Sequence, residues 1–134
     1  MRKLGLATLA LLLTSLPAAA EEPYLFDVMK NPAYRQAWIA MMSGGDGAPR
    51  WLGQVTGKGN YVATPGRRAA IGGANYRFFH ACEAHNCAGS QFEVMFTADG
   101  RRAYGMLLVE GHPPRWYGGP DAAMQAALAK AMNN

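Results

Sequence analysis

Histidine and cysteine are scarce in this chain of 134 residues, which contains three histidines and two cysteines. No serine or cysteine nucleophile signature accompanies His80, His85 or His112. Nucleophilic catalysis needs a nucleophile with a base within hydrogen-bond reach, and the sequence offers no such set. We therefore expect the protein not to be an enzyme and to need no cofactor.

The net charge of the chain is also small. The sequence has 13 basic and 9 acidic residues, a net charge of +4, and two of the basic residues, Arg2 and Lys3, belong to a predicted export signal. A weak positive charge spread along the chain gives no argument for a nucleic-acid partner. The basic pairs Arg67-Arg68 and Arg101-Arg102 lie in or beside predicted turns, where we expect a solvated surface.

Residues 1–20 have the pattern of a secretory signal peptide. A basic start precedes an uncharged apolar stretch over residues 4–16, and the small residues Ala18 to Ala20 form a cleavage site. The stretch is shorter than the roughly 20 residues that span a membrane, and no cysteine is present there for a lipid anchor. We predict cleavage after Ala20 and export of residues 21–134, with no membrane partner, to an oxidising compartment.

Residues 21–134 contain no repeat, low-complexity tract or linker, so we expect one domain. Asn31-Pro32 predicts a helix start, and Ser43-Gly44-Gly45 ends that helix before an irregular connection over residues 44–60. A second helix is predicted to begin at Pro120, with Asp121 in its first turn. Apolar residues at helical spacing mark the core face of these helices: Tyr34, Trp38, Met41 and Met42 in the first, and Met124, Leu128 and Met132 in the second.

Between the helices the pattern favours strands. Phe92, Val94 and Phe96 alternate on one face of a strand, and Asp99-Gly100 predicts a hairpin turn after it. The expected strands are residues 61–64, 68–71, 76–81, 91–97, 102–109 and 115–117. We therefore predict an α+β fold, a mostly antiparallel sheet flanked by N-terminal and C-terminal helices.

Both cysteines fall in one six-residue segment, Cys82-Glu83-Ala84-His85-Asn86-Cys87. If they pair, they close a tight loop that protrudes from the scaffold with His85 near its tip. A loop ordered in advance lowers the entropic cost of binding a partner. The segment therefore suggests a recognition loop with His85 as its contact residue.

Three other interpretations of this segment remain open. His80, Cys82, His85 and Cys87 offer metal-ligand types, but they are crowded together and the compartment favours oxidation, so we predict no metal ion. Redox catalysis is disfavoured because thioredoxin-like sites space their cysteines as Cys-x-x-Cys. The third interpretation is a purely structural disulfide in a periplasmic adaptor domain.

The segment from Cys82 to Cys87 resembles the signature loop of the inhibitor of vertebrate lysozyme (Ivy) family, usually Cys-Lys-Pro-His-Asp-Cys. The aromatic strand before the loop and the phenylalanine-rich strand after it are also similar to that family. So are the turn at residues 98–101 and the tail from Arg115-Trp116 to Pro120-Asp121. The resemblance covers nearly all of residues 21–134.

This resemblance implies a periplasmic inhibitor of C-type lysozyme from a Gram-negative bacterium. In the family the loop enters the lysozyme cleft and its histidine contacts the two catalytic carboxylates, so the implied key contact is His85 and the implied disulfide is Cys82–Cys87. The family fold is a mostly antiparallel sheet with flanking helices. Family members are often dimeric, so a homodimer is among the states that the resemblance implies.

Three loop positions depart from the commonest motif, because Glu83 replaces lysine, Ala84 replaces proline and Asn86 replaces aspartate. Alanine in place of proline leaves the free loop looser, and Glu83 puts a negative charge beside the tip. These changes suggest weaker inhibition or a different muramidase as the target. The bacterium's own lytic transglycosylases are the alternative partner.

Overall fold

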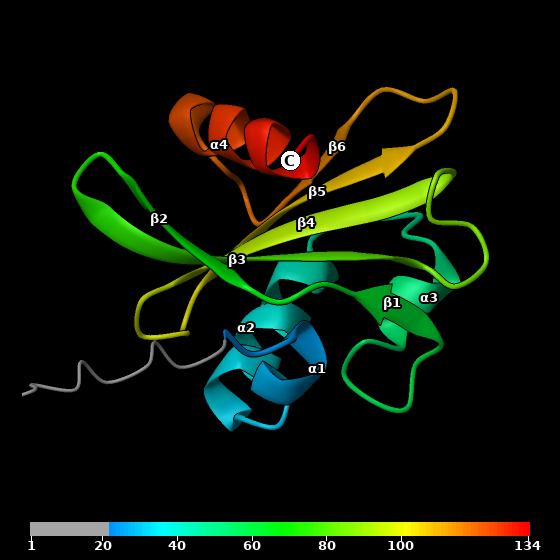
Figure 1. The fold of residues 1–134 in the computed structure, drawn as a ribbon, viewed down its shortest axis with the longest axis horizontal. Helices are drawn as coiled ribbons and strands as arrows, with labels where there is room; N and C mark the ends of the chain where they lie inside the picture. Colours follow the sequence, from blue (N-terminus) through cyan, green and yellow to red (C-terminus); the bar gives the residue numbers. More distant parts are fainter. Residues whose placement is uncertain (1–21) are drawn as a thin grey trace, which may run out of the picture.

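The structure, a computed structural model, describes residues 22–134 as an α+β fold in which a six-stranded sheet lies between helices (Figure 1). This arrangement confirms the predicted fold class. The predicted signal peptide lies outside the described residues. Within residues 22–134, no helix has the length and apolar character needed to cross a membrane.

The sheet is antiparallel throughout. Its strands follow the order β1-β3-β4-β5-β6, and β2 also pairs with β3. β3 is longer than predicted and carries β1 and β2 one after the other along the same edge. The strands are β1 Tyr61–Ala63, β2 Arg67–Ile71, β3 Ala74–Glu83, β4 Ser90–Thr97, β5 Ala103–Val109 and β6 Arg115–Tyr117.

The predicted Asp-Gly hairpin joins β4 to β5. Gly100 has a φ of 71°, a conformation that glycine adopts without steric cost. One oxygen of Asp99 accepts hydrogen bonds from the Thr97 hydroxyl at 2.7 Å and from the Arg101 backbone N–H at 3.0 Å. These bonds hold the pKa of the Asp99 carboxyl below its usual range.

Three helices pack on one face of the sheet: α1 (Leu25–Val28), α2 (Pro32–Ser43) and α3 (Arg50–Gly53). α2 begins as predicted, with the Asn31 side chain accepting a hydrogen bond from the Ala33 N–H at 2.9 Å. Of its predicted core face, Tyr34, Trp38 and Met41 are buried and Met42 is partly buried. Trp38 contacts Phe92 edge to face with ring centroids 5.4 Å apart. The short helices α1 and α3 were not predicted, and α3 lies inside the connection that we expected to be irregular.

α4 (Ala122–Met132) packs on the opposite face (Figure 1), where Leu128 and Met132 are buried against β4 and β5. One part of this prediction was wrong. Asp121 is the N-cap residue and accepts a hydrogen bond from the Met124 N–H at 2.9 Å, so the helix begins at Ala122 and not at Pro120. An aspartate side chain at the N-cap satisfies a backbone donor of the first turn.

The second helix layer makes β4 a strand buried on both faces. Phe92, Val94 and Phe96 face α2, while Glu93 and Met95, both 0% exposed, lie on the α4 face. The sequence predicted the first of these faces and not the second.

A buried carboxylate links several elements across this second face. Glu93 accepts a hydrogen bond from Arg67 on β2 at 3.0 Å and pairs with His80 on β3 at 3.1 Å. The same nitrogen of Arg67 also donates to the backbone oxygen of Ala131 on α4. Arg67 is therefore not the freely solvated side chain that the sequence suggested, because its guanidinium neutralises a buried charge.

Candidate functional site

The connection between β3 and β4 is a closed loop at one end of the sheet (Figure 1). Cys82, buried near the end of β3, forms a disulfide with Cys87, and their Cα atoms lie 4.8 Å apart. The pairing that the family resemblance implied is therefore present. It brings all six predicted site residues into one small ring.

His85 lies at the turn of this ring and is exposed to solvent. The Asn86 N–H donates to the Glu83 carbonyl oxygen at 3.0 Å, which closes a four-residue turn with His85 in its third position. His85 has a φ of 64°, and no other residue except glycine has a positive φ among residues 22–134. A side chain in this left-handed region is uncommon, so the ring holds His85 in a conformation that a free chain seldom visits.

Polar contacts inside the loop support this turn. The side-chain amide of Asn86 donates to a carboxylate oxygen of Glu83 at 2.9 Å. The backbone oxygen of Asn86 accepts hydrogen bonds from Gly89 at 3.1 Å and Ser90 at 3.0 Å. A Cβ atom at position 89 would collide with the Asn86 side chain, so glycine there leaves room for Asn86 in the position from which it contacts Glu83. Glu83 and Asn86, which lie before and after His85 in the sequence, are thus linked to each other.

The base of the loop is fixed from two directions. Trp51 on α3 donates from its indole N–H to the Ser90 hydroxyl at 2.9 Å in a buried contact. On the other side, the Glu110 N–H donates to the Gly89 carbonyl oxygen at 3.0 Å. Tyr61, which lies across the ladder from Glu83, is partly buried, and burial together with the nearby Asp27 charge raises the pKa of its phenol. The loop therefore stands on a rigid, largely desolvated base.

The three histidines do not come together. His80 lies on β3 and pairs with Glu93, and His112 lies in the turn between β5 and β6. The disulfide consumes both thiols, which removes two of the four ligands in the metal interpretation. Residues 22–134 contain no cluster of three or more side chains suited to holding a metal ion.

Chemically, the site presents one imidazole on a closed, preordered loop. Its only neighbour with charge inside the ring is Glu83, whose carboxylate is engaged by Asn86. Such an arrangement can donate or accept a hydrogen bond in a partner's cleft. The sequence located this ring correctly and indicated Trp51 as an anchoring aromatic, but it did not predict that Trp51 contacts Ser90, 39 positions away, at the base of the ring.

The chain is similar in sequence to known proteins. A protein of Pseudomonas aeruginosa described as inhibitor of vertebrate lysozyme is 29% identical, over 99% of this chain and 94% of that protein. An uncharacterised protein of Yersinia pestis is 23% identical, over 81% of this chain and 76% of that protein.

The sequence model of one protein family matches residues 33–134, a region that includes the loop and the whole sheet. The description of that family is inhibitor of vertebrate lysozyme (Ivy). This match extends over well more than half of the chain, and the chain therefore belongs to the inhibitor of vertebrate lysozyme family.

Proposed function

We propose that this protein inhibits C-type lysozyme by inserting the Cys82–Cys87 loop into the active-site cleft, with His85 as the central contact. The observation that carries the proposal is the conformation of His85. This exposed side chain is held at a positive φ by a disulfide-closed turn whose base is anchored on both sides. Membership of the Ivy family supports a lysozyme-inhibitor role in general.

The chemistry of the target explains why an imidazole suits this role. Lysozyme pairs a carboxylic acid of raised pKa with an ionised carboxylate across its cleft. An imidazole between two such groups donates a hydrogen bond to one or both of them. A charge-assisted hydrogen bond of this kind is stronger than a neutral one. The loop also fills the space that the sugar needs, so the protein acts as a plug and not as a catalyst.

The affinity also depends on how well the loop is ordered before binding, because the cost of ordering it is subtracted from the free energy of the contacts. The disulfide and the contacts of Asn86 restrict the loop before it meets a partner, which lowers the ordering cost on binding. One loop alone is too small for a tight complex. We expect further contacts around it, to a total buried area of about 1,600 Å².

We also propose that residues 1–20 direct export to the periplasm and are removed after Ala20, leaving residues 21–134 as the inhibitory domain. A disulfide between the only two cysteines fits an oxidising compartment. Glu22, directly after this predicted mature start, forms ion pairs with Arg68 at 3.1 Å and Arg77 at 3.8 Å. The folded domain thus engages residues very close to the proposed cleavage site. N-terminal sequencing of the exported protein tests the position of cleavage.

The test of inhibition is a titration of C-type lysozyme, acting on bacterial cell walls, with residues 21–134 and with the His85→Ala variant. We expect stoichiometric inhibition by the wild type. The variant should lose about 2 kcal/mol or more, roughly thirtyfold in the inhibition constant, as expected for a buried central contact. Because His85 is exposed in the free protein, the variant should keep its thermal stability.

The outcomes separate the alternatives. Equal inhibition constants for the wild type and His85→Ala would rule out the plug mechanism. No inhibition by the wild type would turn attention to lytic transglycosylases, to be assayed in the same way, or to an adaptor domain with a structural disulfide. Analytical ultracentrifugation of the free protein and the complex gives the stoichiometry and tests for the homodimer that the resemblance implies.

A further inference from the structure

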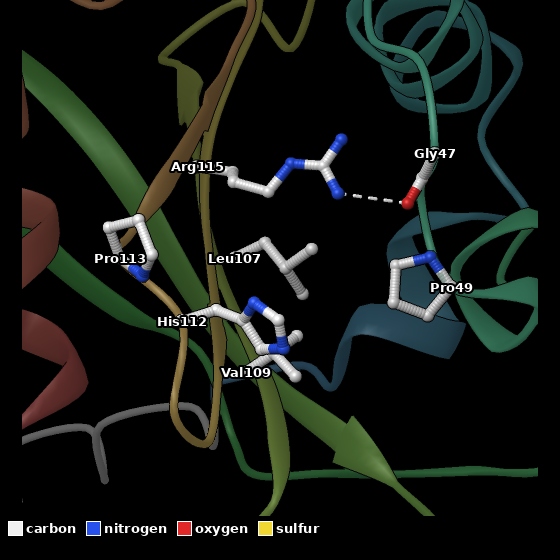
Figure 2. Close-up of a pocket in the computed structure, with 7 residues that line it drawn as sticks. All are labelled: Gly47, Pro49, Leu107, Val109, His112, Pro113 and Arg115. Atoms are coloured by element: carbon white, nitrogen blue, oxygen red, sulfur yellow. Dashed lines mark hydrogen bonds between the residues drawn. The ribbon is translucent and has the colours of Figure 1, made fainter.

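A groove lies beside the loop, between the β5–β6 turn and the connection from α2 to α3 (Figure 2). Its volume is about 380 Å³, large enough for one side chain. Leu107 and Val109 form its apolar floor, and the rings of Pro49 and Pro113 stand on either side. We call it the Arg115 groove; its lining residues are Gly47, Pro49, Leu107, Val109, His112, Pro113 and Arg115.

The groove is formed before any partner binds. The guanidinium of Arg115 donates to the backbone oxygen of Gly47 at 2.9 Å, as Figure 2 shows, and its other terminal nitrogen donates to the backbone oxygen of Asp46. Gly47 has a φ of 70°, and a Cβ atom there would press on the guanidinium. Proline fixes φ in two of the walls. The cation is therefore held in a set position.

The charge of this guanidinium is not neutralised within the described part of the chain. Its hydrogen bonds go to two neutral carbonyl groups, and none of the ion pairs among residues 22–134 includes Arg115. Arginine has five N–H donors, so donors remain free for a ligand. His112 adds a second nitrogen-bearing side chain at the opposite end of the groove. A carboxylate on a short apolar stem complements both the floor and the charge.

The groove and the loop belong to one rigid surface. Val109, on the groove floor, pairs with Ser90 at the base of the loop, and the adjacent Glu110 N–H donates to Gly89. Neighbouring strands lie about 4.8 Å apart. An inhibitory interface of about 800 Å² on each side would therefore extend over both features.

We propose that the Arg115 groove is the second contact of the inhibitory surface and receives an aspartate or glutamate side chain from the rim of the target enzyme's cleft. The carboxylate accepts hydrogen bonds from the free N–H groups of Arg115, and its stem packs on Leu107 and Val109. This inference rests on the proposed lysozyme inhibition. It adds to the loop a recognition site of opposite charge to Glu83.

Two groove variants and one control test this proposal by inhibition kinetics on C-type lysozyme. Arg115→Gln removes the cation, and Val109→Glu places a competing carboxylate on the groove floor while keeping Arg115. We expect each to raise the inhibition constant about tenfold. Arg102→Gln, an exposed arginine in the β4–β5 turn at the other end of the sheet, removes the same charge and should change the constant less than about twofold. Thermal unfolding of all variants verifies that they fold.

Each outcome has a distinct meaning. Wild-type inhibition that both groove variants retain overturns the groove assignment and leaves the function standing. Equal weakening by Arg115→Gln and Arg102→Gln overturns it too, because net charge alone would then explain the effect. A lack of inhibition by the wild type overturns both proposals. Arg115→Gln also removes the hydrogen bonds to Asp46 and Gly47, so it could weaken inhibition by loosening that segment. Val109→Glu keeps these bonds, so a loss of inhibition in that variant does not have this explanation.

Discussion

At the scale of single residues, Asn86 explains how this loop holds its turn without the proline and aspartate of the commoner motif. Its side chain donates to Glu83, and its backbone accepts from two N–H groups that follow the disulfide. An amide can serve here where an aspartate cannot, because Glu83 already supplies the carboxylate. The two departures from the motif at positions 83 and 86 are therefore coupled.

This coupling predicts that Asn86→Asp weakens inhibition although it restores a residue of the commoner motif. Two carboxylates would replace a contact of 2.9 Å, and like charges at that distance repel. We expect a loss of about 1 kcal/mol, roughly fivefold in the inhibition constant near pH 7. The double variant Glu83→Gln with Asn86→Asp restores a donor and an acceptor and should recover potency. Additive losses in the double variant would refute the coupling.

At the scale of elements, the loop depends on its disulfide for function more than the fold depends on it for stability. Closing a six-residue loop stabilises the folded state by about 2 kcal/mol on the chain-entropy estimate. The sheet has extensive pairing besides it, because β4 pairs with β3 from Tyr76 to Cys82 and both β1 and β2 pair with the other edge of β3. The positive φ of His85, in contrast, belongs to the closed ring.

We therefore predict that reduction of Cys82–Cys87 raises the inhibition constant at least tenfold while the domain stays folded. Inhibition is measured with and without reductant, and circular dichroism under both conditions monitors folding. The Cys82→Ala/Cys87→Ala double variant avoids effects of the reductant on lysozyme's own disulfides. Full potency of the reduced or double-variant protein, with the fold intact, would argue against a preordered loop.

The elements themselves were predictable where the signal was local. The capping of α2 by Asn31, the alternation of β4 and the Asp-Gly turn depend on residues within a few positions of one another, and all three are confirmed. The four-residue helices α1 and α3 are too short to show a period of 3.6 residues. Pro120 was a misleading signal, because the stronger cap next to it, Asp121, sets the start of α4.

At the scale of the whole molecule, two features that the sequence did not reveal, the buried Glu93 cluster and the Arg115 groove, depend on distant contacts. The alternation of β4 predicts that the Glu93 side chain points to solvent. In the structure α4 covers this side chain, and Arg67, 26 positions earlier in the sequence, neutralises its charge. The Arg115 groove likewise needs Gly47, which is 68 positions from Arg115. The site loop could be predicted from the sequence because its residues are contiguous. The surface around the loop could not, because it is formed by residues far apart in the sequence.

Glu93 is buried between the sheet and α4, and its contacts help to hold these two parts of the fold together. Its carboxylate is 0% exposed and contacts Arg67 and His80, while Arg67 also holds the backbone of α4. Removing Arg67 would leave the fully buried carboxylate of Glu93 without its cation, and an uncompensated buried charge costs about 3–5 kcal/mol. That is a large share of the roughly 5–15 kcal/mol by which domains of this kind are stable.

Arg67→Gln should therefore lower the free energy of unfolding in urea by about 3 kcal/mol. Arg68→Gln is the matched control, because it breaks the ion pair with Glu22, in which the Arg68 side chain is 67% exposed; its loss should stay below about 1 kcal/mol. The folded Arg67→Gln protein should inhibit lysozyme as the wild type does, since Arg67 lies on β2, outside the proposed contact surface. Equal losses in the two variants would mean that the buried cluster contributes no more than a surface pair, and that apolar packing alone joins α4 to the sheet.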